Sequence, residues 1–214
     1  MLELRSRRYD LHLRHTFRLA RGASDERHNL FLELEHEGLV GLGEAAPIER
    51  YGQDWRSAAT AAETIVDRLE DPAHFFDAAN RLAPVGRPAA EAAIDMALRD
   101  LAGKRLPAPL YELHGIDPSP TPPTSFTLGM ATPEAIVTKV EEAGDYEILK
   151  IKMGSDDDRR ILEAVRAVTD RPLRVDANEG WTLEGAVERL EWLQKMGVEL
   201  VEQPLPEGEL EAMI

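Results

Sequence analysis

The second part of the chain alternates short apolar stretches with amphipathic ones at intervals of roughly 25 residues, which is typical of consecutive βα units in a parallel sheet. The apolar stretches predict strands at 124–129, 147–152, 172–177 and 198–202. The stretches between them predict helices at 133–144, 156–168 and 182–196. This α/β pattern fits either a doubly wound open sheet or a (β/α)8 barrel.

Two observations bear on the choice between these folds. No Gly-x-Gly-x-x-Gly sequence follows any of the predicted strands, which disfavours a doubly wound dinucleotide-binding sheet. A complete barrel needs about 250 residues, whereas residues 124–214 hold only about four βα units. If the fold is a barrel, only about four of its eight units are present, and the chain as given cannot close it.

The first part of the chain predicts an α+β domain. Strand patterns occur at 2–14, 30–36 and 39–45, and helical patterns at 55–69, 73–82 and 89–102. Glu37 and Gly38 suit the tight turn of a hairpin between the second and third strands. Residues 20–27 are polar and predict a loop.

Cap and linker signals mark the boundaries of these elements. Asp54 or Ser57 can cap the first helix, Pro88 suits the start of the third, and Gly103 lies just beyond its predicted end. Residues 107–123 are rich in proline and predict a linker. The predicted domains are therefore 1–106 and 124–214.

Composition limits the classes of partner. The formal net charge is −15 with acidic residues spread along the chain, which argues against a nucleic-acid partner. With no cysteine, disulfides and thiolate metal sites are excluded. No stretch approaches the roughly 20 consecutive apolar residues of a membrane span, and no apolar segment marks a secretory signal. We expect a cytoplasmic protein, and a homo-oligomer is left open.

Two lysines stand out in a chain with five lysines and twenty arginines. Lys150 and Lys152 share one face of the second predicted strand of the repeat, about 7 Å apart, while Leu149, Ile151 and Met153 occupy the other. Both ammonium groups would point into a barrel, where burial and mutual repulsion lower a lysine pKa toward that of a general base. The alternative is an edge strand with two solvated lysines.

Carboxylates end the next two strands. Asp176 and Glu202 lie one βα unit apart, so they would stand at matching heights where barrel enzymes build active sites. Two such carboxylates repel each other unless a cation lies between them, and hard oxygen ligands suit Mg²⁺. Alternatively, Asp176 caps a loop and Glu202 pairs with a lysine.

The histidines and serines do not form a recognisable metal site or nucleophile motif. No pair of histidines has zinc-site spacing supported by a third ligand, and no Gly-x-Ser-x-Gly sequence is present. We interpret all six histidines as structural or surface residues: His12, His15, His28, His36, His74 and His114.

Three short motifs resemble the enolase superfamily, in its muconate-lactonising subgroup. They are Lys150-x-Lys152, Asp176-Ala-Asn178 and Glu202-Gln-Pro204, one at each of three consecutive strand ends. Enolase-superfamily sites use a Lys or His base with Mg²⁺. The resemblance implies a partial (β/α)8 barrel, the first half of a modified TIM barrel, preceded by an α+β capping domain. It also implies that the chain as given is incomplete and inactive on its own. Within the subgroup, three stretches are similar to dipeptide epimerases of the L-Ala-D/L-Glu type: residues 17–22, residues 41–52, and residues 175–181 together with 202–206.

The resemblance implies a magnesium-dependent isomerase. It would epimerise a dipeptide, a small-molecule substrate, by removing a proton next to a carboxylate and passing through an enolate. By this likeness Lys152 takes the α-proton and Lys150 helps neutralise the enolate. Asp176 and Glu202 would bind Mg²⁺.

The resemblance also implies substrate contacts and alternatives. Arg21 would meet a substrate carboxylate, and Thr127 would contact the substrate beside the base. Family members take a third carboxylate ligand and a second lysine from later strands. The alternatives are o-succinylbenzoate synthase, N-acylamino acid racemase or, from another class, a non-catalytic fragment or binding module.

Overall fold

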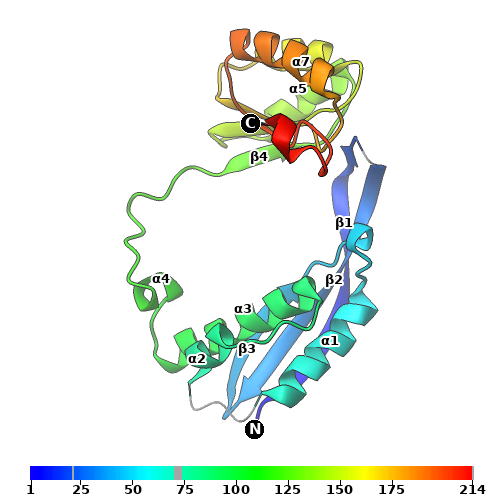
Figure 1. Ribbon diagram of the computed structural model, residues 1–214. Helices are drawn as coiled ribbons and strands as arrows, with labels where there is room; N and C mark the ends of the chain where they lie inside the picture. Colours follow the sequence, from blue (N-terminus) through cyan, green and yellow to red (C-terminus); the bar gives the residue numbers. More distant parts are fainter. Residues whose placement is uncertain (21, 70–73, 214) are drawn as a thin grey trace. The chain divides into compact units, whose positions relative to one another are not determined.

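The computed structural model describes residues 1–20, 22–69 and 74–213 (Figure 1). The chain divides into two compact units, each described by itself below. The first unit comprises Met1–His12 and Glu26–Pro120, and the second comprises Leu13–Asp25 and Thr121–Ile214. The change of unit at Pro120 falls inside the proline-rich segment 107–123. Residues 13–25 group with the second unit, where the backbone N–H of Met130 donates to the carbonyl of Arg18 at 3.0 Å.

A three-stranded sheet in the order β1-β2-β3 forms the framework of the N-terminal region. Its strands are β1 (Glu3–Leu19), β2 (Gly22–His36) and β3 (Leu39–Ala45). Strands β2 and β3 are antiparallel, with Leu30 opposite Ala45 and His36 opposite Leu39. Glu37 and Gly38 both have positive φ, 50° and 81°, as tight hairpin turns require. The predicted hairpin is confirmed.

The predicted loop at 20–27 is wrong, because β1 runs to Leu19 and β2 already begins at Gly22. Side chains bond between the two strands here: Thr16 donates to Asp25 at 2.5 Å, and His28 pairs with Asp10 at 2.7 Å. Residues 22–27 are therefore polar because their side chains lie on a strand paired with β1, and not because the segment is a loop.

Helices pack on one face of this sheet, through the alternation that buries Leu30, Leu32 and Leu34 of β2. They are α1 (Trp55–Arg68), α2 (Phe75–Asn80), α3 (Pro88–Arg105) and α4 (Leu110–Leu113), with a 3-10 turn at Glu49–Tyr51. Asp54 caps α1 in a reciprocal capping box with Ser57, and Pro88 begins α3 as predicted.

Two helix predictions need correction. Helix α3 passes through Gly103 and ends at Arg105, so Gly103 does not terminate it. A glycine suits this position because the chain after the helix packs closely against it. A Cβ on Gly103 would lie 3.1 Å from the carbonyl oxygen of Ala108. The predicted linker 107–123 contains the short helix α4, which the proline content concealed.

Helix α3 approaches β3 very closely. A Cβ on Gly41 would lie 2.1 Å from the carbonyl oxygen of Ala97, and one on Gly43 would lie 2.0 Å from that of Ala93. Real Cβ contacts are never this short, so these two glycines set the distance between helix and strand.

We expect Gly43→Ala to destabilise the protein by about 1–3 kcal/mol, because α3 must move away from β3 and its packing is lost. Chemical denaturation monitored by circular dichroism measures this. Leu42→Ala is the matched control on the same strand, since Leu42 is 55% exposed and faces away from the helix. A loss for Gly43→Ala no greater than for Leu42→Ala would contradict the packing argument.

The second unit contains a four-stranded parallel sheet in the order β4-β5-β6-β7. Its strands are β4 (Ser125–Leu128), β5 (Ile148–Lys152), β6 (Leu173–Asp176) and β7 (Val198–Glu202). The helices are α5 (Pro133–Glu142), α6 (Asp158–Arg166) and α7 (Leu183–Lys195), followed by a 3-10 turn at Leu210–Met213. The predicted strands and helices of this region are confirmed to within a few residues.

The order of the strands decides between the two predicted folds. Strands follow one another in sequence order, and the helices of this unit lie together on one side of the sheet (Figure 1). A doubly wound sheet would reverse its order and carry helices on both faces. The observed arrangement is that of a partial (β/α)8 barrel. Its core is formed by the helix-facing residues of the strands, among them Leu149, Ile151 and Met153, all fully buried.

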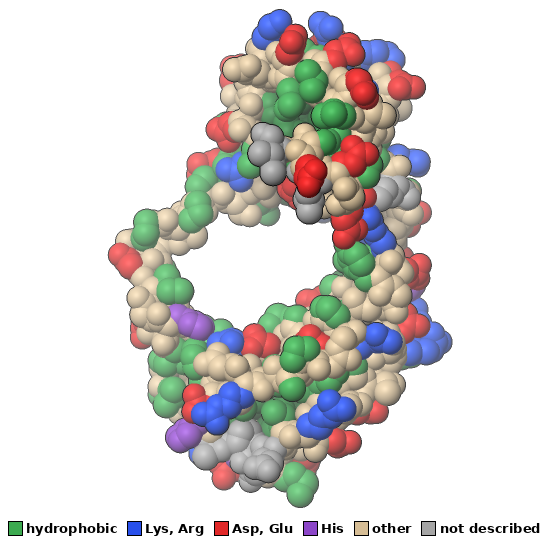
Figure 2. Space-filling view, viewed as in Figure 1, with side chains coloured by type: hydrophobic (Ala, Val, Ile, Leu, Met, Phe, Trp, Pro, Cys, Tyr) green, Lys and Arg blue, Asp and Glu red, His purple; other side chains and the backbone are tan. Residues whose placement is uncertain are grey.

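Charged side chains are widely distributed. On the face drawn in Figure 2, acidic and basic side chains are interspersed and do not gather into one basic patch. Among the described residues, no helix combines the length and apolar character needed to cross a membrane.

Candidate active site

The carboxyl ends of the parallel strands bring the predicted site residues together. Lys152 on β5 is paired in register with Asp176 on β6, and Asp176 is paired with Glu202 on β7. Lys150 stands one residue pair deeper on β5, opposite Thr127 of β4. These side chains occupy the face of the sheet opposite the helices, because the apolar residues between them pack against the helices.

Three ion pairs join the four charged residues. The Lys150 Nζ lies 2.6 Å from Glu202 Oε2 and 2.9 Å from Asp176 Oδ2. The Lys152 Nζ lies 2.6 Å from the same Asp176 oxygen. The Asp176 side chain is only 1% exposed and that of Lys152 10%, whereas Glu202 is 46% exposed. The cluster therefore has a buried centre at Asp176 and an open side at Glu202.

The electrostatic balance favours the charged forms. Burial raises the pKa of Asp176, but hydrogen bonds from Lys152 and Lys150 outweigh it and hold that pKa below its usual value. Burial lowers the pKa of Lys150, but hydrogen bonds to Glu202 and Asp176 outweigh it and raise the pKa above its usual value. The predicted lowering of the Lys150 pKa is therefore wrong, because the two carboxylates stabilise the ammonium.

Contacts expected of a purely structural role are also present. Asp176 Oδ1 accepts the backbone N–H of Asn178 at 2.9 Å, and Glu202 pairs with Lys150. These contacts coexist with the convergence of two lysines and two carboxylates, which a loop cap alone does not require. The alternative of two solvated edge lysines is excluded, since β5 lies between β4 and β6.

The donor set fits a hard divalent cation. Two carboxylates on neighbouring strands already share one cation, the ammonium of Lys150. The side-chain oxygen of Asn178 is buried and has no hydrogen-bond partner among the described residues. Buried polar atoms normally have a partner, and carboxylate and amide oxygens are the ligands that Mg²⁺ and Ca²⁺ prefer.

Asn178 was missed as a site residue by the sequence analysis. The signals were its position two residues after Asp176 on the same face and the preference of Asn for left-handed backbone, here φ 48°. Thr127 lies on β4 and lines a cavity of about 360 Å³ within the second unit, with Phe17 and Lys139 among its walls. Arg21 lies outside the described residues.

Backbone hydrogen bonds continue beyond the strands and fix their ends. The N–H of Met153 donates to the carbonyl of Asp176 at 2.9 Å, and that of Ala177 donates to Glu202 at 3.1 Å. Further out, Glu179 donates to Gln203 at 2.8 Å and Trp181 to Pro204 at 3.1 Å. The segment that contains Asp176 is thus joined by backbone hydrogen bonds to the segment after β5 and to the segment after β7.

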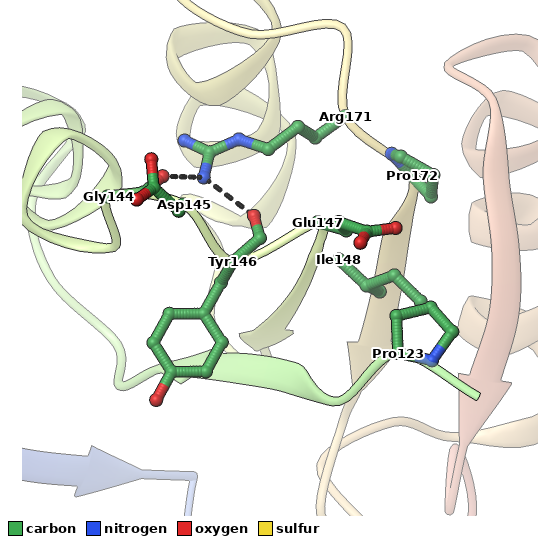
Figure 3. A pocket seen from close by; sticks show the side chains of 8 residues that line it. All are labelled: Pro123, Gly144, Asp145, Tyr146, Glu147, Ile148, Arg171 and Pro172. Carbon is green, nitrogen blue, oxygen red and sulfur yellow. Dashed lines mark hydrogen bonds between the residues drawn. The ribbon is translucent and has the colours of Figure 1, made fainter. Parts of the chain in front are cut away.

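Another cavity, of about 500 Å³, lies at the opposite end of the sheet, near the residues that precede β5 and β6 (Figure 3). There Arg171 donates to the carbonyl oxygens of Gly144 and Tyr146, at 3.1 and 3.0 Å, and to that of Val140. A guanidinium satisfied by backbone carbonyls at the amino ends of the strands has a structural role.

A second group of potential metal ligands lies in the first unit, where Asp10, Glu26 and His28 come together. Arg8 donates to Asp10 at 2.5 Å and supplies positive charge there. The pKa of Asp10 is lowered by its bonds to Arg8 and His28. The charges of this group are therefore balanced by its own neighbours.

The fold and the site define a (β/α)-barrel protein with lysines and acidic oxygen ligands at the carboxyl ends of its strands. Residues 2–115 match the N-terminal domain of mandelate racemase and muconate lactonizing enzyme, and residues 132–214 match the enolase C-terminal domain-like family. The chain belongs to the mandelate racemase/muconate lactonizing enzyme family of the enolase superfamily.

Relatives within this family include epimerases. The chain is 37% identical over 209 residues to an L-Ala-D/L-Glu epimerase of Bacteroides thetaiotaomicron, covering 95% of this chain and 54% of that protein. It resembles a dipeptide epimerase of Enterococcus faecalis, solved with Mg and L-Leu-L-Tyr, with TM-score 0.87, 32% identity and coverage of 99% and 62%. An N-succinyl Arg/Lys racemase of Bacillus cereus follows with TM-score 0.85, 25% identity and coverage of 98% and 61%. The chain thus spans between half and two thirds of the length of these relatives.

We expect Asp176→Asn to destabilise the protein by about 3 kcal/mol without divalent cations, because it leaves two ammonium groups without their buried counter-charge. Glu202→Gln should cost less than about 1 kcal/mol, since its carboxylate is half exposed to water. Urea denaturation in the presence of EDTA measures both. Equal losses for the two variants would show that Asp176 is not the electrostatic centre of the cluster.

Proposed function

We propose that the whole protein is a magnesium-dependent epimerase that acts on dipeptides. The observation that carries the proposal is the convergence of Lys150, Lys152, Asp176 and Glu202 within 2.9 Å contacts at the carboxyl ends of three neighbouring strands. The similarity to enzymes named as L-Ala-D/L-Glu and dipeptide epimerases supports the choice of reaction.

Asp176 and Glu202 would hold Mg²⁺, with Asn178 supplying an amide oxygen nearby. Bound there, Mg²⁺ supplies Lewis-acid stabilisation of negative charge on a substrate carboxylate. Lys150 now occupies the space between the two carboxylates. If the two carboxylates held a divalent cation, the Lys150 ammonium would be released from them and could pair with an anionic substrate.

Lys152 is the proposed base. A proton next to a carboxylate is very weakly acidic, so its removal requires both a positioned base and stabilisation of the enolate that forms. Lys152 is held at the edge of the cluster by Asp176, and as an amine it can release and accept a proton, which arginine cannot do in proteins. Epimerisation then needs a donor on the opposite face, which the family resemblance assigns to a later strand.

The substrate contacts remain those that the resemblance implies. Arg21 would bind an acidic side chain or terminal carboxylate of the dipeptide, and Thr127 would contact the substrate beside Lys152. The second candidate is racemisation of an N-acylamino acid, which uses the same lysines and carboxylates. It is favoured by the structural similarity to an N-succinyl Arg/Lys racemase.

We expect the full-length protein to exchange the α-proton of Ala-Glu dipeptides with D2O in a Mg²⁺-dependent reaction followed by NMR. Lys152→Met should slow exchange by about 10²–10⁴-fold, the usual contribution of a general base. Lys195→Met, a change in the last turn of α7, is the control and should leave the rate unchanged.

The outcome discriminates between the candidates. Exchange with N-succinyl amino acids in preference to dipeptides would select the racemase, and wild-type exchange rates in Lys152→Met would remove Lys152 as the base.

We expect Arg21→Ala to raise KM for dipeptides with an acidic side chain by at least tenfold more than for neutral ones. A charge-assisted, bidentate contact with a carboxylate is stronger than a neutral hydrogen bond, and its loss removes ground-state binding. Steady-state kinetics with Ala-Glu and Ala-Leu measure the difference. A similar rise in KM for both substrates would show that Arg21 does not bind the acidic side chain.

A further inference from the structure

We propose that Asp158 is a positioning residue that locks the segment after Lys152 to the segment after Asp176, and so fixes the proposed base relative to the proposed metal ligand. This inference deepens the proposed function and rests on it. Asp158 begins α6 and is only 2% exposed, yet it makes no direct contact with the charged cluster.

The Asp158 carboxylate accepts hydrogen bonds from two different loops. Its Oδ1 accepts the backbone N–H groups of Gly154 and Ser155, at 3.0 and 2.9 Å, and the Ser155 hydroxyl at 3.1 Å. Its Oδ2 accepts the indole N–H of Trp181 at 3.0 Å and also the backbone N–H of Gly154 at 3.1 Å. Gly154 and Ser155 follow β5, whereas Trp181 follows β6, so one buried carboxylate joins the two loops.

These loops leave each other no free space. A Cβ on Gly180 would lie 2.8 Å from the Cα of Gly154, and one on Gly154 would lie 3.1 Å from the carbonyl oxygen of Ala177. Gly154 also has φ +120°, which an L side chain rarely adopts. A loop packed this closely and held in a glycine-only conformation moves as a unit with the anchor that holds it.

The anchor lies close in sequence to both functional groups. Gly154 is two residues beyond Lys152, and Trp181 is five residues beyond Asp176. Release of Trp181 from Asp158 would let the two loops shift separately, and with them the end of β5 relative to β6. The ammonium-to-carboxylate distance of 2.6 Å between Lys152 and Asp176 depends on that register.

Both carboxylate oxygens of Asp158 are required for this role, because Oδ1 accepts from the loop after β5 and Oδ2 accepts from the loop after β6. Asn could keep the bonds from Gly154 and Ser155 through its single carbonyl oxygen, but its amide NH2 would then meet the Trp181 N–H, donor against donor. Arg189 adds positive charge near the link, 3.8 Å from Asp158 Oδ2 and over the Trp181 ring at 5.4 Å from its centroid.

The test uses Asp158→Asn, Trp181→Phe and the double variant in the full-length protein with Mg²⁺. A displacement of about 1 Å can cost on the order of 10²-fold in rate. We therefore expect each single variant to lower kcat for α-proton exchange by about 10–100-fold, with KM changed less than threefold. The double variant should be no slower than the slower single one, because both remove the same hydrogen bond.

Thr132→Ala is the control for a loss of stability without loss of the link. Thr132 caps α5 by accepting the N–H of Ala135 at 3.3 Å and touches neither loop. Its loss should lower the melting temperature while leaving kcat within twofold. Multiplying rate losses in the double variant, or an unchanged kcat in Trp181→Phe, would overturn the proposal.

Amide hydrogen exchange tests the link without activity. In Asp158→Asn we expect faster exchange in both 153–156 and 178–181, and in Thr132→Ala in neither. Acceleration confined to 153–156 would show that Asp158 does not couple the loops. A wild-type protein without α-proton exchange would instead refute the proposed function, and the exchange experiment would still decide whether the link exists.

Discussion

The buried carboxylate of Asp176 is the constraint around which the second unit is arranged. A charge that is 1% exposed is costly unless it is paired and hydrogen-bonded. Here Lys150 and Lys152 from β5 and the N–H of Asn178 provide that compensation, and Lys150 extends it to Glu202 on β7. Three strands are thereby tied at their carboxyl ends by charge, in addition to the ladder between their backbones.

The same compensation makes the site suitable for chemistry. A cluster in which two ammonium groups and two carboxylates satisfy one another is balanced, so a divalent cation or an anionic substrate can replace one partner without leaving a buried charge alone. Sites of this kind trade stability for function. The loops around the cluster are held by backbone bonds and by Asp158, which leaves the exchange of partners to the side chains.

Periodicity predicted most elements of the fold, because alternation along a strand and spacing along a helix follow from local geometry. It failed at residues 22–27, whose polar side chains predicted a loop although these residues belong to β2. It also failed at Gly103, where a glycine that usually ends a helix lies inside one. The glycine at position 103 accommodates the close approach of Ala108. A contact of this kind cannot be predicted from the local sequence pattern.

The sequence by itself determined that Lys150, Lys152, Asp176 and Glu202 share one end of a parallel sheet, since strand alternation and unit spacing place them there. Only the tertiary structure decided their partners and the direction of the pKa shifts of Lys150 and Asp176. The pKa of Lys150 depends on its contacts with two carboxylates from other strands, and burial with repulsion between the two lysines predicted the wrong direction. The unpaired oxygen of Asn178 and the two-loop link through Asp158 were likewise decided by tertiary structure, because each depends on contacts between segments that sequence spacing does not specify.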